Sequence, residues 1–285
     1  MMWISYYVYI WDMNAVDRLI NIIASRLKEH KITNYFFIRY WEGGPHVRIR
    51  VKENKSISHE SIYKILVLST QEFFSKNPTS SIVRLDKNEF YKKSFTDGKN
   101  INVNDYPWYK NGEIVKAKYI PETDRYGGAK MIRKSEDSFI CSSDLAVSIL
   151  KFEPSFGNKV SLLFAIFNYL VENIFQNDIE NEVEFLINSK HFWINSGIKV
   201  KSGVTNTDLW QQLETIVNKL RSVPALSMLL SSLITIYESD ELSLKYRRAI
   251  IFSHFHMLAN RLGVPISYEL LFYQLKLERM KLNGR

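Results

Sequence analysis

The stretch FFIRYWEGGPHVRIR, residues 36–50, gathers basic side chains in two short runs that alternate as β-strands do. Because successive side chains of a strand point to opposite faces, His46, Arg48 and Arg50 share one face. Arg39 lies on the neighbouring run. Guanidinium groups bind carboxylates and phosphates through paired hydrogen bonds, so this pattern indicates an anion-recognition surface. A solvated sheet face, paired with acids of a neighbouring helix, is the alternative, and alternation alone does not decide between the two.

A second candidate anion site lies in YIPETDRYGG, residues 119–128. The paired glycines permit positive backbone φ and a close backbone approach. A helical pattern begins directly after them, and the first turn of a helix offers N–H groups and a positive dipole end to an anion. Arg125 and Tyr126 would lie at this turn. In the alternative, the turn only joins a strand to a helix, with Arg125 paired to Glu122 or Glu136.

The segment SHFHMLANRLG, residues 253–263, carries two histidines near the predicted end of a helix. Residues four apart share a helix face, so His256 and Asn260 lie together, whereas His254 and Arg261 lie on another face. An imidazole beside an amide suits proton transfer near neutral pH. A histidine with a purely structural role is the alternative.

Alternation and helical periodicity predict the elements that position these residues. Their order, strand–helix–strand–strand–helix–strand, is that of a ferredoxin-like unit. The region 77–110 contains NPTS, TDGKN and NDYPW and is predicted to be loop-like. Strands are predicted over 3–10, 34–41, 46–52 and 112–120, and helices over 14–29 and 56–76, the second one capped by Ser56 or Ser58.

From residue 129 onward, every segment has a helical pattern. We therefore expect an α+β fold, in which a ferredoxin-like antiparallel-sheet region over 1–128 is followed by an all-helical region over 129–285. The predicted helices cover 129–152, 158–176, 178–190, 206–221, 224–238, 240–262 and 266–282.

Composition limits the classes of function. The 285 residues carry a formal charge of +8, which suits acidic ligands, RNA or an acidic partner protein. The single cysteine, Cys141, excludes an internal disulfide framework. The chain starts without a signal-peptide pattern, and its longest uncharged run, 222–237, contains Pro and several Ser, so we expect a cytoplasmic protein without a membrane span. Motifs for a metal, a nucleotide cofactor or a nucleophilic Ser or Cys are absent.

Taken together, these motifs resemble the C-terminal domain of lantibiotic dehydratases, which also occurs alone in thiopeptide-type bacteriocin biosynthesis. The resemblance runs from Trp3 to about residue 263 and, since it begins at Trp3, implies a stand-alone subunit without a preceding glutamylation domain. The family's Asp-Ser pair is replaced here by Ser142-Ser143, which removes a carboxylate. The matching motifs are WISYY at 3–7, FFIRYWEGGPHVRIR, YIPETDRYGG, Glu136-x-x-Phe139 with the two serines, and HMLANRLG.

In that family, glutamate is first attached to a peptide Ser or Thr and then eliminated, which leaves dehydroalanine or dehydrobutyrine. The resemblance therefore implies a lyase that eliminates glutamate from a ribosomal precursor peptide, leader and core. It implies a glutamylating dehydratase subunit as partner, and it requires no cofactor or metal. Catalytic roles are implied for His256, Arg50 and Arg125, and substrate-binding roles for Arg39, His46, Arg48, Tyr126 and Asn260.

Two alternatives stay open. Some stand-alone relatives are pyridine synthases, which join two dehydroalanines in a formal aza-cycloaddition and release the leader peptide. The intact arginine and histidine set favours elimination over that reaction. A non-catalytic scaffold that binds an acidic leader peptide by strand addition is the second alternative. Direct tRNA binding and a homodimeric assembly also stay open.

Overall fold

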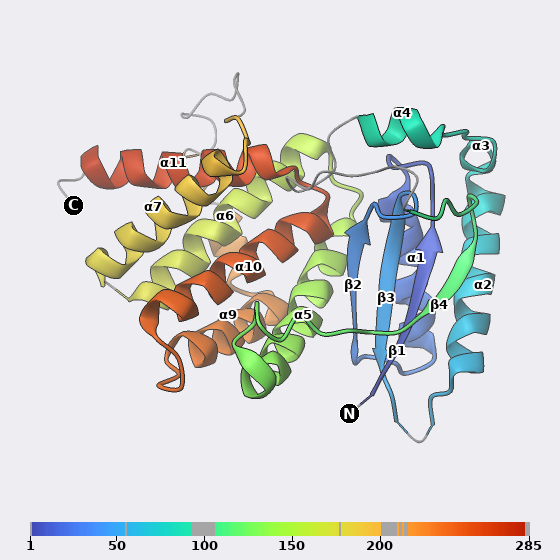
Figure 1. The fold of residues 1–285 in the computed structure, drawn as a ribbon, viewed down its shortest axis with the longest axis horizontal. Helices are drawn as coiled ribbons and strands as arrows, with labels where there is room; N and C mark the ends of the chain where they lie inside the picture. Colours follow the sequence, from blue (N-terminus) through green and yellow to red (C-terminus); the bar gives the residue numbers. More distant parts are fainter. Residues whose placement is uncertain are drawn as a thin grey trace. The chain divides into compact units, whose positions relative to one another are not determined.

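The computed structural model describes residues 2–54, 56–92, 106–176, 178–200, 210, 213 and 216–282. The chain forms two compact units (Figure 1). The predicted boundary after residue 128 stays a prediction. The sheet unit comprises Met1–Ile120 and Val147–Glu153, and the helical unit comprises Pro121–Ala146 and Pro154–Arg285.

The sheet unit contains one four-stranded antiparallel sheet, which confirms the predicted strands. The strand order across the sheet is β2-β3-β1-β4. The last strand is shorter than the predicted segment 112–120. The strands are β1 (Trp3–Tyr9), β2 (Tyr35–Tyr40), β3 (His46–Lys52) and β4 (Ile114–Ala117).

Two helices lie against one face of this sheet (Figure 1). The β3 side chains on that face, Val47, Ile49 and Val51, are buried. On the same face, the Tyr6 hydroxyl donates a hydrogen bond to the backbone oxygen of His59, at 3.1 Å. Removal of this apolar layer from water stabilises the unit. It also fixes the register of the strands, so that the alternate side chains lie on the sheet face opposite the helices. The helices are α1 (Val16–Glu29) and α2 (His59–Lys76).

The segment after α2 contains more regular structure than its loop-like composition predicted. The prediction is wrong at α3 (Pro78–Ser81) and α4 (Lys87–Lys92), which are short helices. Ser80 of α3 is buried and donates a hydrogen bond from Oγ to Oδ2 of Asp12, at 2.6 Å. This long-range contact holds the first short helix in place. Residues 93–105, which include TDGKN, lie outside the described residues.

The helical unit contains the helices predicted from residue 129 onward, with shifted ends. The helix predicted over 178–190 continues to Asn195. Half of the helix predicted over 206–221 lies outside the described residues, and 210, 213 and 216–220 are helical. The helices are α5 (Gly128–Leu150), α6 (Phe156–Phe175), α7 (Ile179–Asn195), α9 (Pro224–Tyr237), α10 (Leu244–Leu262) and α11 (Ile266–Leu282).

Polar and glycine residues set the ends of the helices that carry the candidate site. Ser58 is the N-cap of α2, because its side chain accepts a hydrogen bond from the Ser61 N–H. Ser243 has the same role in α10 and delays its start relative to the predicted 240. Gly263 ends α10 with φ +70°, the left-handed conformation that glycine adopts most easily.

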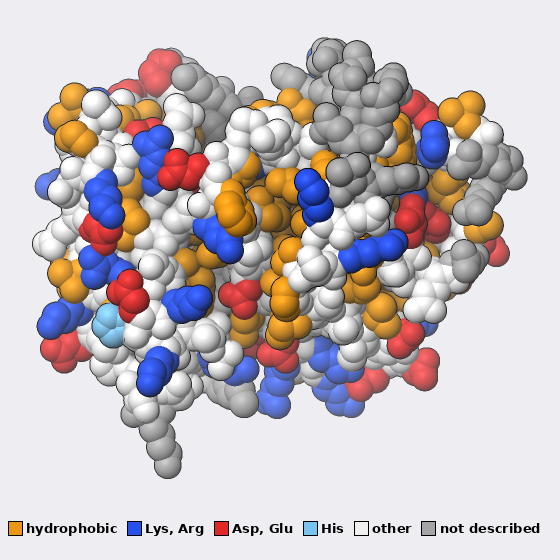
Figure 2. Space-filling view, turned by 180° about the vertical axis from the view of Figure 1, so that it is seen from behind, with side chains coloured by type: hydrophobic (Ala, Val, Ile, Leu, Met, Phe, Trp, Pro, Cys, Tyr) orange, Lys and Arg blue, Asp and Glu red, His pale blue; other side chains and the backbone are white. Residues whose placement is uncertain are grey.

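The surface carries mixed charges. Figure 2 shows Lys and Arg side chains interspersed with Asp and Glu over the face in view, without a continuous basic stripe. In the part of the chain that the structure describes, no helix is both long and apolar enough to cross a membrane. Cys141 on α5 is half-buried, and burial raises the pKa of its thiol.

Candidate functional site

The basic hairpin presents its charged residues on the sheet face away from α1 and α2. Arg48 of β3 is paired with Tyr7 of β1, and His46 is paired with Tyr9. Side chains at paired positions share a face, so two tyrosine rings lie beside the basic side chains. The His46 ring lies 4.9 Å from the Tyr7 ring in a stacked arrangement, and 4.6 Å from the Tyr9 ring. The face is therefore aromatic as well as basic.

The guanidinium group of Arg48 is held between two rings. Its central carbon lies 3.6 Å from the centre of the Tyr40 ring and 4.5 Å from that of Tyr7. Cation–π attraction of this kind fixes the plane of the guanidinium. The carboxylate of Glu42 lies 3.9 Å from Nη2, at the outer limit of an ion pair, and the Arg48 side chain is 15% exposed. The two rings thus hold the Arg48 guanidinium as a rigid, positively charged fork, with the Glu42 carboxylate at the edge of ion-pair range.

His46 holds the Nε–H side of the Arg48 guanidinium. Its side chain is 2% exposed, and Nδ1 lies 2.8 Å from the carbonyl oxygen of Gly44. Because a carbonyl only accepts, Nδ1 carries the hydrogen, and Nε2 accepts from Nε–H of Arg48 at 3.1 Å. Burial, reinforced by the charges of Arg48 and Arg50, lowers the pKa of His46 to about 3. His46 is therefore uncharged at neutral pH, and its predicted substrate-binding role stays a prediction.

The other two hairpin arginines have different surroundings. Arg50 is nearly buried, with its guanidinium 4.8 Å from the Tyr119 ring. Arg39 points to the opposite sheet face and forms an ion pair with Asp17 of α1, at 2.5 Å. This pairing matches the alternative in which the basic groups of the hairpin pair with acids of a neighbouring helix. Arg39 thus ties β2 to α1, and its predicted substrate contact stays a prediction.

Arg125 precedes α5 in the helical unit. Its Nη1 lies 3.2 Å from Oε2 of Glu122, and its Nε donates to Oγ of Ser253 on α10, at 3.1 Å. The Glu122 pairing is the structural alternative considered for this turn. The Arg125 side chain is still partly exposed. The turn thereby brings this guanidinium close to the helix that carries the two histidines.

The residues after Arg125 pack tightly in the helical unit. Tyr126 is buried, with its ring 4.9 Å from the Phe139 ring and 5.3 Å from that of His254. Gly127 has φ +85°, and a Cβ atom there would lie 2.8 Å from Cβ of Met131. Glycine is therefore required at this position. The predicted substrate-binding role of Tyr126 stays a prediction.

His256 is held by a carboxylate that the sequence did not point to. Its Nδ1 lies 3.0 Å from Oε1 of Glu269 on α11, and its ring lies 5.1 Å from the Trp193 ring of α7. The His256 side chain is 12% exposed. Asn260, one turn further along α10, is half-buried. Glu269 was missed because an acidic residue in the first turn of a helix is ordinary.

Two motifs that carry the family resemblance meet inside the helical unit. Arg261 of HMLANRLG is buried and donates from Nε to Oγ of Ser143, at 3.0 Å, and from Nη1 to Oγ of Ser142, at 3.3 Å. These hydrogen bonds join α10 to α5. The serine pair that replaces the family's Asp-Ser pair is thus a direct partner of a buried guanidinium.

The described residues contain no group of three or more His, Cys, Asp or Glu side chains that could hold a metal ion. The hairpin residues His46 and Arg48 contact each other directly, and they belong to the sheet unit. Arg125, Tyr126, His256 and Asn260 belong to the helical unit.

Residues 3–279 match the model of the lantibiotic biosynthesis dehydratase C-terminal family. The chain belongs to this family. A comparison with curated proteins gave no match. The family membership confirms the resemblance drawn from the motifs and places the protein in a family of lantibiotic biosynthesis.

Three solved structures share the fold of this family member at low sequence identity. The pyridine synthase TbtD from thiomuracin biosynthesis has a TM-score of 0.57 and 15% identity, with 96% of each chain covered. The tRNA-dependent lantibiotic dehydratase MibB from Microbispora sp. 107891 has a TM-score of 0.56 and 16% identity. That match covers 96% of this chain and 27% of MibB. TsrL has a TM-score of 0.55 and 14% identity, with 99% of this chain and 95% of TsrL covered.

Proposed function

We propose that this chain is a glutamate eliminase, a lyase that converts glutamylated Ser or Thr of a ribosomal precursor peptide to dehydroalanine or dehydrobutyrine. The reaction is a β-elimination. A base takes the Cα proton, the bond between Cβ and the ester oxygen breaks, and glutamate leaves as a carboxylate. No electrons are gained or lost overall, so the reaction needs no oxidant or reductant.

The observation that carries this proposal is the arrangement around Arg48. An eliminase must hold a glutamyl group that bears a free carboxylate, and a guanidinium fork matches a carboxylate in two parallel hydrogen bonds. The Tyr7 and Tyr40 rings and the Nε2 acceptor of His46 fix the plane of this fork before substrate arrives. Preorganisation of this kind strengthens recognition, because less freedom is lost on binding.

His256 is the proposed base of the elimination. Its Nδ1 is bonded to Glu269, which leaves Nε2 with its lone pair to receive the Cα proton. Arg125 and Arg50 are proposed to stabilise the carboxylate charge that develops on the leaving glutamate. Tyr126 and Asn260 are proposed to shape the surroundings of this base. The substrate contact of Arg39, which points to the sheet face opposite Arg48, stays a prediction.

The partners follow from this reaction. The precursor peptide binds through its leader and core, and a glutamylating component, which uses glutamyl-tRNA, supplies the ester. Such chemistry belongs to the cytoplasm. The strand order β2-β3-β1-β4 supports a ferredoxin-like topology for the sheet unit, with a helical remainder that carries the proposed base.

Pyridine synthesis is the second candidate function. It is favoured by the match to TbtD, which covers 96% of both chains. The replacement of the family's Asp-Ser pair by Ser142-Ser143 also allows a specialised reaction. Fold similarity at this identity does not discriminate between the two reactions.

The decisive test uses an N-acetylated synthetic peptide that carries one glutamyl ester on serine. Incubation with the purified protein should release one glutamic acid per ester, detected by mass spectrometry. Arg48→Lys keeps the charge but removes the planar fork. We expect it to lower kcat/KM by about 10- to 100-fold, which corresponds to the loss of a charge-assisted hydrogen bond of about 1.5–3 kcal/mol.

Arg26→Lys is the matched control, because Arg26 forms an ion pair with Glu72 on the helix layer, at 2.6 Å. It should leave kcat/KM within about twofold of the unmodified protein, as expected for a surface pair. An intact ester after long incubation would contradict elimination. Conversion of a dehydroalanine-rich peptide to a pyridine would then establish the second candidate, and tight leader binding without turnover would indicate a scaffold.

A further inference from the structure

We infer that Glu269 is the positioning residue for His256: it selects the imidazole tautomer and stabilises the imidazolium that forms during elimination. This inference rests on the proposed function. The bond joins Nδ1 of His256 on α10 to Oε1 of Glu269 on α11, at 3.0 Å. A carboxylate oxygen only accepts, so Nδ1 carries the hydrogen and Nε2 remains available as a base. The tautomer that proton abstraction requires is thus set by a residue outside the family motifs quoted above.

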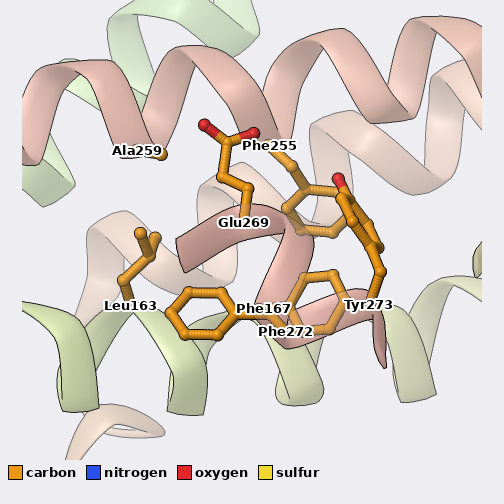
Figure 3. Close-up of a pocket in the computed structure, with 7 residues that line it drawn as sticks. All are labelled: Leu163, Phe167, Phe255, Ala259, Glu269, Phe272 and Tyr273. Atoms are coloured by element: carbon orange, nitrogen blue, oxygen red, sulfur yellow. The ribbon is translucent and has the colours of Figure 1, made fainter. Parts of the chain in front are cut away.

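The surroundings of Glu269 argue against an ordinary surface acid. Its side chain is 5% exposed, and Oε2 is buried without a hydrogen-bond partner among the described residues. Beside it is a cavity of about 10 Å³, close to the smallest space that holds one water molecule. Figure 3 shows the carboxylate pointing away from the Phe167 and Phe272 rings. The cavity is lined by Glu269 and by Leu163, Phe167, Phe255, Ala259, Phe272 and Tyr273.

Burial of a carboxylate in such apolar surroundings has a free-energy cost that a leucine or a glutamine would not incur to the same extent. Two basic residues of the same two helices have other partners. Lys276 of α11 pairs with Glu172 at 2.6 Å, and Arg248 of α10 pairs with Glu184. Burial raises the pKa of Tyr273 well above its usual value, with the charge of Glu269 acting in the same direction, so this phenol stays uncharged. His256 is the group whose charge this carboxylate can balance.

During elimination the imidazole takes the Cα proton at Nε2 and becomes positively charged. A carboxylate 3.0 Å from Nδ1 stabilises that charge most strongly in a site with little solvent. The contribution of Glu269 therefore grows from the ground state to the transition state. An interaction of that kind should affect kcat more than KM.

The competing explanation is structural. The same hydrogen bond could simply join α10 to α11, as the Lys276–Glu172 pair joins α11 to α6. A purely structural bond would lower the free energy of unfolding when it is removed, with little change in kcat. The two explanations therefore differ in whether loss of the bond appears mainly in kcat or mainly in stability.

The first measurement is the imidazole ¹⁵N spectrum of the full-length protein, labelled on histidine and assigned with the His256→Asn variant. We expect a protonated Nδ1 and an unprotonated Nε2 for His256 at neutral pH. In Glu269→Gln, a mixture of tautomers should replace this state, because an amide can either accept or donate. A wild-type His256 protonated at Nε2 would overturn the inference, whatever reaction the protein catalyses.

The second measurement is a double-mutant cycle on glutamate release from the same ester peptide. Glu269→Gln should lower kcat by about 10- to 100-fold, with KM changed by less than about twofold. Glu269→Asp should retain part of the activity. In the His256→Asn background, Glu269→Gln should cause no further loss. Equal losses in both backgrounds would show that Glu269 acts independently of His256 and would overturn the inference.

Glu172→Gln is the matched control, because it removes a glutamate from an interhelical ion pair without touching a histidine. It should leave kcat unchanged. If the unmodified protein releases no glutamate, the proposed function fails, while the ¹⁵N spectrum still tests the tautomer. The failure of the function and the failure of the inference are thus separate results.

Discussion

Helix α10 carries two histidines that are two residues apart and have opposite surroundings. His254 is buried against α5, where its Nε2 lies 3.2 Å from the hydroxyl of Ser135. His256 keeps some exposure and lies 3.0 Å from the carboxylate of Glu269. One imidazole has a neutral partner and the other has an anionic partner. The same residue type is therefore available for two roles on one helix.

The difference follows from helix geometry and from what each face contacts. Two residues along a helix correspond to a rotation of about 200°, so the two side chains point to different neighbours. Burial lowers the pKa of His254 to about 3, and the charges of Arg261 and Arg125 act in the same direction. His254 is therefore an uncharged core residue at neutral pH. His256 instead has its Nδ1 bonded to a carboxylate, which leaves Nε2 to receive a proton.

The largest expected effect separates the two histidines by activity. His256→Asn should lower the rate of glutamate release by about 10²- to 10⁴-fold, the usual contribution of a general base. The side chain is at the edge of the core, so the fold should persist. The rate is measured by mass spectrometry on the glutamyl ester peptide, and folding is checked by thermal unfolding.

His254→Asn should have its main effect on stability. It removes a ring that packs 5.3 Å from the Tyr126 ring and 5.2 Å from the Phe139 ring. A polar amide in that space should lower the free energy of unfolding by about 1–3 kcal/mol. Chemical denaturation measures the change. If His254→Asn lost as much activity as His256→Asn without loss of stability, the assignment of roles would be reversed.

The next prediction concerns pH. The folded protein holds His254 at a pKa of about 3, whereas an unfolded histidine titrates near 6.5. Below that value the unfolded chain binds more protons, so the free energy of unfolding falls as pH drops from about 6.5 toward 3. By pH 5 the loss reaches at most about 2 kcal/mol. His46, with its pKa also lowered to about 3, adds a loss in the same window.

Urea unfolding at pH 7, 6 and 5 measures this slope. His254→Asn should show a shallower dependence than the unmodified protein, because one of the two buried histidines is gone. His191→Asn is the matched control, since His191 is exposed on α7. A slope that His254→Asn leaves unchanged would show that His254 is protonated in the folded protein.

The comparison also shows what the sequence could predict. Strand alternation correctly placed His46, Arg48 and Arg50 on one face, because period-two patterns are local. Helical spacing correctly separated His254 from His256. Patterns of this kind need only neighbouring residues, and the helices and strands that position the candidate site were predicted for the same reason.

The partners of these residues were not predictable. Glu269 is 13 residues from His256, and Ser135 is 119 residues from His254. Local spacing along the sequence therefore predicts neither contact. The loss of charge on His46 depends on burial by distant rings, including Tyr9. Helix α4 depends on similar contacts: the hydroxyl of its Tyr91 accepts from the Gly43 N–H, 48 residues away. Tertiary contacts decide such properties after the local elements have formed.

The smallest expected effect tests the neutral partner of His254. Ser135→Ala removes the hydroxyl 3.2 Å from Nε2 and should lower the free energy of unfolding by about 1 kcal/mol. In the His254→Asn background, Ser135→Ala should lower the free energy of unfolding by less, because the ring nitrogen bonded to the hydroxyl is absent. Ser138→Ala, which removes a buried hydroxyl bonded to Ser232, should lower stability equally in both backgrounds. Equal effects of Ser135→Ala in both backgrounds would contradict a bond between Ser135 and His254. A coupling confined to Ser135 would instead establish that a hydroxyl holds one imidazole of α10, while a carboxylate holds the other.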